Sequence, residues 1–137
     1  MDEVTVRVEA EVYPTESEEK VTRAVTNLFG SITLQTKPAY KGSVLTGEAK
    51  GQDSLVKFRN LLRNDRVRNA ARKALFRSIR RNTISFCLNK QVAFAGHLSF
   101  SQEVAESPLG PVKVMIECGE PRQLIAWLAP RTTEKGV

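Results

Sequence analysis

The sequence predicts an α+β fold: a single domain in which helices pack on one face of a largely antiparallel sheet, with a mixed sheet as the alternative. Segments in which apolar and polar residues alternate, as in half-buried strands, are interspersed with segments of helical apolar spacing. Several neighbouring strand segments are joined by stretches too short for the crossover that parallel strands need. The length of 137 residues suits one domain. We place it at 1–131, followed by a short tail at 132–137.

The first half of the chain predicts a strand, a helix, two strands and two helices. Residues 3–13 carry apolar side chains at every second position, which predicts a strand that Pro14 ends. Thr15 and Glu18 have the spacing of a capping box at the start of a helix, and Gly30 is a usual helix stop. The elements that follow are strands at 31–37 and 43–49, a helix carrying Leu55, Phe58, Leu61 and Leu62, and a basic helix at about 66–80.

The second half predicts three strands and a last helix. The strand segments are TISFCL, VAFAGHLSF and VKVMIEC, at 83–88, 92–100 and 112–118. Between the first two, residues 89–91 are expected to form the tip of a hairpin. Pro121 suits the first turn of a helix because its backbone angle is already helical. The predicted order is therefore β-α-β-β-α-α-β-β-β-α.

Charge is distributed unevenly along the chain. Residues 57–81 contain ten basic side chains and one acid, Asp65, whereas the net charge of the whole chain is only +6. The rest of the protein is therefore mildly acidic, with seven acids in residues 1–20 alone. No apolar run is long enough to cross a bilayer and the N-terminus does not look like a secretory signal, so we expect a cytoplasmic protein.

The basic helix predicts a surface for RNA. Small apolar residues cover one half of its helical projection, and basic residues gather on the other half around Phe76. No acids at helical spacing neutralise the basic half, and arginine suits both phosphate oxygens and base stacking. The predicted phosphate contacts are Arg66, Arg68, Arg72, Lys73, Arg77, Arg80 and Arg81, with Phe76 stacking on a base and Lys90 touching the backbone from the hairpin tip.

An alternative use of the same helix is docking on an acidic protein partner, or on the acidic segment of a second copy in a homodimer. We expect no enzyme, metal or cofactor, because the sequence shows no nucleophile–base pair, metal-ligand spacing or phosphate-binding loop. Cys87 and Cys118 are too few for a disulfide framework. A pocket that joins His97, Lys90 and a carboxylate would instead favour an enzyme acting on a phosphorylated small molecule.

Five motifs, in order, resemble a family of small, mostly uncharacterised archaeal proteins that are predicted to bind RNA or to associate with the exosome. They are YPTESEEKV, RNLLRNDRVRNAAR, NKQVAF, SPLGPV and WLAPRT. The resemblance implies an archaeal cytoplasmic source and an α+β fold related to the large-subunit ribosomal protein that binds 5S ribosomal RNA. It implies no catalytic residues. Where an acidic residue is expected before the tryptophan of WLAP, this chain has Ala126, so we expect Trp127 to serve in packing.

Overall fold

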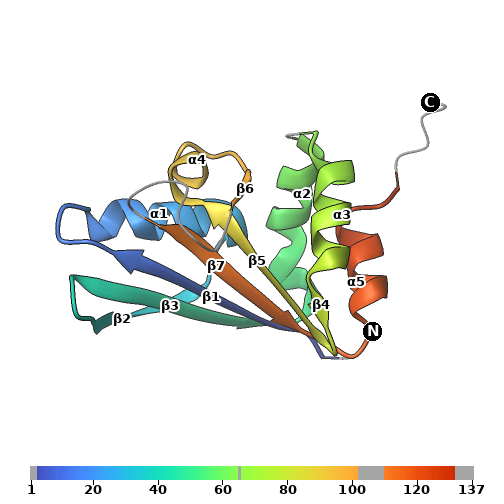
Figure 1. Ribbon diagram of the computed structural model, residues 1–137, viewed down its shortest axis with the longest axis horizontal. Helices are drawn as coiled ribbons and strands as arrows, with labels where there is room; N and C mark the ends of the chain where they lie inside the picture. The colour runs from blue at the N-terminus through green and yellow to red at the C-terminus, as the bar shows by residue number, and fades with distance from the viewer. Residues whose placement is uncertain (1–2, 65, 102–109, 132–137) are drawn as a thin grey trace.

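A computed structural model describes residues 3–64, 66–101 and 110–131, and its chain forms an antiparallel sheet of seven strands with helices packed against it (Figure 1). The hydrogen-bonded order is β2-β3-β1-β7-β5-β4, and β6 pairs with β5 off this path. The strands are β1 (Thr5–Val12), β2 (Thr33–Pro38), β3 (Ser43–Lys50), β4 (Ile79–Arg80), β5 (Thr83–Asn89), β6 (Phe100–Ser101) and β7 (Pro111–Glu117). The predicted fold class is confirmed.

The helices form two groups (Figure 1). They are α1 (Glu18–Phe29), α2 (Val56–Asn64), α3 (Arg68–Arg77), α4 (Lys90–Phe94) and α5 (Pro121–Leu128), with a 3₁₀ turn at Gln52–Leu55 before α2. Helices α1 and α4 lie together over one part of the sheet, whereas α2, α3 and α5 stand side by side at the other end. This second group carries most of the basic segment.

Strand β1 lies in the middle of the sheet, between β3 and β7. Its alternation buries Val6, Val8 and Ala10 against the helices and leaves Arg7 and Glu9 on the open face, as residues 3–13 predict. Aromatic rings then link the two groups of helices. Phe29 of α1, Phe58 of α2, Phe86 of β5 and Phe100 of β6 form a chain of rings whose consecutive centroids lie 5.4, 5.6 and 5.6 Å apart.

The predicted hairpin at 89–91 is wrong, and so is the predicted strand at 92–100 except at Phe100. Lys90–Phe94 forms the short helix α4, and only Phe100–Ser101 is a strand. The side-chain oxygen of Asn89 accepts a hydrogen bond from the backbone N–H of Val92 at 2.9 Å, which caps the helix. Gly96, with a φ of +90°, then turns the chain back. A cap and a turn glycine therefore override an alternation of apolar residues.

Two other helix boundaries also differ from prediction. Helix α1 is capped by Ser17, whose hydroxyl accepts from the N–H of Lys20 at 3.4 Å, and not by Thr15. The predicted basic helix at 66–80 is confirmed only over Arg68–Arg77, because Ile79 and Arg80 pair with β5 as strand β4. The tail predicted at 132–137 and Asp65 lie outside the described residues.

Candidate nucleic-acid interface

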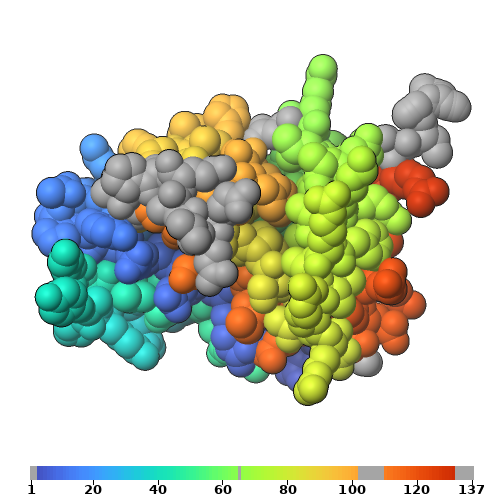
Figure 2. Space-filling view, in the orientation of Figure 1, coloured from blue at the N-terminus to red at the C-terminus, as the bar shows by residue number. Residues whose placement is uncertain are grey.

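Helix α3 is packed on one side and exposed on the other. Ala71 and Leu75 are fully buried and Ala74 is half-buried, which confirms most of the predicted packing side, although Ala70 is exposed. In the space-filling view, α3 and the β4 turn form a continuous yellow-green column along the height of the molecule (Figure 2). The basic residues of this segment are therefore displayed along one side of the protein.

Arg59 and Arg72 stabilise the end of α5. The Arg59 Nε donates to the carbonyl of Trp127 at 2.9 Å, and the Arg72 Nη1 donates to the carbonyl of Ala129 at 3.1 Å. These carbonyls belong to the last turn and cap of α5, where backbone acceptors lack helical partners and the helix dipole favours a cation. Both arginines are half-buried. Arg72, predicted to contact phosphate, therefore already holds a position within the fold.

Phe76 lies under guanidinium groups from two helices. The Arg72 Cζ lies 4.9 Å and the Arg122 Cζ 5.5 Å from the centroid of its ring, and the ring is half-buried against the core. Trp127 is covered similarly, with the Arg59 Cζ at 4.9 Å, in agreement with the expected packing role. Such cation–π contacts stabilise partly exposed aromatic rings. The ring of Phe76, predicted to stack on a base, is thus occupied by arginines of the same chain.

A further set of cations is left without partners. Within the described residues of the segment 57–81, six basic side chains make neither an ion pair nor a hydrogen bond, and all but Arg68 are exposed. Arg80 is also exposed, but its Nη1 donates to the carbonyls of Arg77 and Ile79 at 3.1 and 2.9 Å. We call these seven residues the basic ridge: Arg63, Arg66, Arg68, Lys73, Arg77, Arg80 and Arg81.

The basic ridge differs from the sequence-predicted surface by a few residues. Arg63 was missed because it lies in the last turn of α2, ahead of the predicted basic helix. The sequence could have identified Arg63, since it belongs to the same basic run of residues 57–81. Arg122 gave no signal, because its contact with Phe76 depends on how α5 packs beside α3.

Lys90 does not lie with the other basic residues. Its ammonium group donates to the carbonyl of Glu11 at 2.8 Å and to both carboxylate oxygens of Glu16 at 3.0 and 3.2 Å, and it lies 5.5 Å from the centroid of the Tyr13 ring. Its side chain is only 4% exposed. The predicted contact between Lys90 and an RNA backbone therefore has no surface on which to form, because burial and ion pairing place this ammonium in the interior.

A pocket of about 350 Å³ beside Lys90 bears on the enzyme alternative. Its lining includes Lys90, Glu16 and Phe94. His97 is not one of the lining residues. The combination of His97, Lys90 and a carboxylate that would favour an enzyme is therefore not assembled in this pocket.

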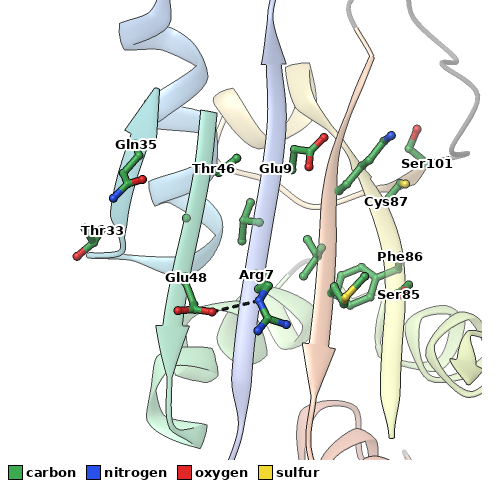
Figure 3. A pocket seen from close by; sticks show the side chains of 15 residues that line it. Arg7, Glu9, Thr33, Gln35, Thr46, Glu48, Ser85, Phe86, Cys87 and Ser101 are labelled. Atoms are coloured by element: carbon green, nitrogen blue, oxygen red, sulfur yellow. Dashed lines mark hydrogen bonds and ion pairs between the residues drawn. The ribbon is translucent and has the colours of Figure 1, made fainter. Parts of the chain in front are cut away.

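The open face of the sheet carries a wide groove of about 1120 Å³ (Figure 3). At its centre Arg7 is paired with Glu48, with 3.1 Å between Nε and Oε2, and with Glu117. The hydrogen bond from Arg7 to Glu117 is the main cause that raises the pKa of this arginine above its ordinary value. Glu9 and Lys113 add one charge of each sign to the lining. Because the two cations and two anions of its lining balance, this groove does not extend the basic surface.

The described residues contain neither a metal site nor a membrane-spanning helix. Residues 3–64, 66–101 and 110–131 contain no group of three or more His, Cys, Asp or Glu side chains placed to hold a metal ion. No helix among them is long and apolar enough to span a membrane.

Comparison with known proteins places the chain in a family. A family model described as RNA binding matches residues 5–118. A UPF0201 protein of Sulfurisphaera tokodaii is 45% identical over 130 residues, 95% of this chain and 89% of its own. A UPF0201 protein of Saccharolobus solfataricus is 43% identical over 94% of this chain and 89% of its own. The crystal structure of a UPF0201 protein from Methanococcus jannaschii, 29% identical, has a TM-score of 0.82 over 92% of this chain and 99% of that one. The chain therefore belongs to the RNA-binding family that this model defines, together with the archaeal UPF0201 proteins.

Proposed function

We propose that this protein binds RNA by placing the basic ridge against the phosphate backbone. The observation that carries the proposal is a set of cations that lack carboxylate partners among the described residues and lie on α2, on α3 and on the segments that flank α3. Membership of a family whose model is described as RNA binding supports the same partner. The exosome association and the kinship with the 5S-binding ribosomal protein that the resemblance implies stay predictions.

Phosphate is the chemistry that the ridge suits. Six of its seven residues are arginines, whose planar fork pairs with two phosphate oxygens at once. Because these side chains form no ion pairs with described residues, binding an anion breaks no existing salt bridge. Each contact also releases condensed counterions from the nucleic acid, which makes the affinity strongly dependent on salt.

The arginines behind the ridge have a supporting role in this proposal. Arg59 and Arg72 hold the end of α5, and Arg72 and Arg122 cover Phe76. These contacts fix α5 beside α3, so that the ridge residues are displayed from a rigid layer. Rigid placement lowers the conformational entropy that binding must otherwise remove.

Fluorescence-anisotropy titration with labelled RNA tests the proposal. Lys73→Gln/Arg77→Gln removes two exposed ridge charges that have no described partner, so the fold should keep its melting temperature while affinity falls about tenfold at physiological salt. The matched control, Lys37→Gln/Lys41→Gln, removes the same charge from the exposed β2–β3 hairpin. Equal losses in both variants would show that overall charge, and not the ridge, governs binding.

The alternative function is docking on an acidic protein or on a second copy of the chain. RNA titration and light scattering on the same purified protein distinguish it from RNA binding. If no RNA binds at low salt and light scattering shows salt-sensitive self-association, the ridge is a protein-docking face. A monomer that binds RNA and loses affinity on Lys73→Gln/Arg77→Gln supports RNA.

A further inference from the structure

We infer that the RNA held by the basic ridge is base-paired, and that Arg66 and Arg81 are two fixed phosphate contacts at opposite ends of α3. This inference rests on the proposed function and narrows it to one class of RNA. Three features of the described residues carry it: the backbone conformation of these two arginines, their placement around a rigid helix, and the occupied aromatic rings beside them.

Arg66 occupies a position that usually belongs to glycine. The N–H of Arg66 donates to the carbonyl of Arg63, and the N–H of Val67 donates to the carbonyl of Leu62, both at 3.2 Å. These two bonds form a Schellman motif, whose turning residue adopts the left-handed conformation and is most often glycine. Arg66 has a φ of +58° there, and its side chain is exposed.

Arg81 occupies a second position of the same kind. Strands β4 and β5 pair through Arg80 and Thr83, which leaves a two-residue turn formed by Arg81 and Asn82. Tight hairpin turns of this length need a positive φ at their first central residue, where glycine, asparagine and aspartate predominate. Arg81 has a φ of +58° and is exposed.

Elsewhere the chain meets this backbone requirement with glycine. The other described residues with positive φ are Gly30, Gly42, Gly51, Gly96 and Gly110, so the two exceptions are both arginines and both flank α3. A left-handed conformation is unfavourable for a residue with a side chain, and such strain is retained mainly at functional sites. Because both side chains are exposed, packing in the core does not explain the choice of arginine.

The two arginines are held at a set separation. Helix α3 has 10 residues, about 15 Å at 1.5 Å per residue, and Ala71 and Leu75 anchor it in the core. Phosphates of a double helix also have set positions, whereas a single strand adapts to the protein that binds it. A-form RNA is recognised mostly through its shape and through backbone contacts. Two cations fixed at opposite ends of a rigid helix suit that target.

The ridge offers no open ring for an unpaired base. Proteins that bind single strands stack bases on exposed aromatic side chains. Here arginines lie over the rings of Phe76 and Trp127. Among the described residues the exposed aromatics are Tyr40, in the β2–β3 turn, and Phe94, in α4, and neither belongs to the α2–α3–α5 group. Backbone contact with paired RNA is the mode that remains.

The test compares an RNA hairpin with an unpaired RNA of equal length and composition. The full chain should bind the hairpin about tenfold more tightly than the unpaired strand. Arg66→Gly/Arg81→Gly should lower hairpin affinity about tenfold and reduce the slope of log K against log salt by about 1.8, the share of two phosphate contacts on a double helix. It should also raise the melting temperature by about 2–4 °C, because glycine adopts the left-handed conformation of both turns without steric strain.

Arg66→Lys/Arg81→Lys is the matched variant, since it keeps both charges and both unfavourable conformations. It should keep the wild-type salt slope and melting temperature. Equal or tighter binding of the unpaired strand would overturn the inference, as would wild-type hairpin affinity in Arg66→Gly/Arg81→Gly. An unchanged melting temperature in the glycine variant would remove the conformational argument. If neither RNA binds the wild-type protein, it is the proposed function that fails.

Discussion

Replacing Lys90 by methionine tests whether this lysine belongs to the interior or to the RNA surface. Lys90→Met keeps an unbranched apolar stem of similar length and removes the ammonium group. That group donates to the carbonyl of Glu11 and to the Glu16 carboxylate. The Lys90 side chain is only 4% exposed and that of Glu16 only 10%. The variant therefore leaves a nearly buried carboxylate whose remaining described hydrogen bond comes from the N–H of Tyr13, at 3.0 Å.

The magnitude follows from the cost of an unpaired buried charge. Breaking a buried pair by removing one partner costs about 3–5 kcal/mol. The lower end applies here, because Glu16 also lines the pocket of about 350 Å³, through which water can reach it. We expect a loss of about 3 kcal/mol in the free energy of unfolding, which for a domain of this length lowers the melting temperature by about 10 °C.

Urea denaturation and RNA titration, done on the same protein, check this prediction. Lys50→Met, which removes an exposed lysine at the end of β3, is the control and should change stability by less than about 0.5 kcal/mol. In the double variant with Glu16→Gln the total loss should be smaller than the sum of the single losses. Lys90→Met should keep its RNA affinity when folded. An interior, structural role for Lys90 is refuted if Lys90→Met is as stable as the control, or if it folds normally and loses RNA affinity.

Two further predictions separate support from binding and test the local electrostatics. Arg72→Gln should lower the free energy of unfolding by about 1–2 kcal/mol, because the carbonyl at the end of α5 loses a charged donor and Phe76 loses a cation. Arg77→Gln should leave the free energy of unfolding unchanged. Equal denaturation midpoints for the two variants would contradict the supporting role of Arg72. The Tyr13 hydroxyl donates to Glu11 at 3.1 Å, and this hydrogen bond is the main reason that the pKa of Tyr13 is raised above its ordinary value. Glu11→Gln should therefore lower that pKa toward its ordinary value. With Tyr40→Phe in the background, Tyr13 is the only tyrosine whose absorbance titrates, and a midpoint that does not move would count against the hydrogen bond.

The sequence predicts the fold well where one local signal agrees with tertiary packing. The alternation in residues 3–13 corresponds to β1, whose valines are buried between α1 and the neighbouring strands. The helical spacing in α1 and the start of α5 at Pro121 are equally direct. These elements bury one face each, so the pattern of apolar residues and the packing require the same structure.

The prediction fails where two local signals compete. Residues 92–100 alternate as a strand does, yet the Asn89 cap starts a helix two residues earlier. Ile79 and Arg80 continue the helical pattern of α3, yet pairing with Ile84 and Thr83 of β5 takes them into the sheet. Hydrogen bonds to other parts of the fold determine the secondary structure of such short segments, and the periodicity of apolar residues carries no information about those bonds.

The candidate site divides in the same way. Residue type alone indicates that the segment 57–81 is basic, and the structure shows that most of these charges lack carboxylate partners among the described residues. Sequence cannot distinguish Lys73, which is exposed, from Arg72, which caps α5. Nor does it reveal that Lys90 is paired with Glu16, 74 residues away along the chain. Such distinctions depend on contacts between distant segments.

The slope of log K against log salt for RNA binding tests the account most directly. It is measured by anisotropy on the wild-type protein, on Lys73→Gln/Arg77→Gln and on the Lys37→Gln/Lys41→Gln control. We predict a steep negative slope for the wild-type protein, a slope shallower by about 1.8 for the ridge variant on base-paired RNA, and an unchanged slope for the control. A wild-type slope near zero, or a ridge variant with the slope of the control, would contradict the claim that the basic ridge binds RNA phosphates.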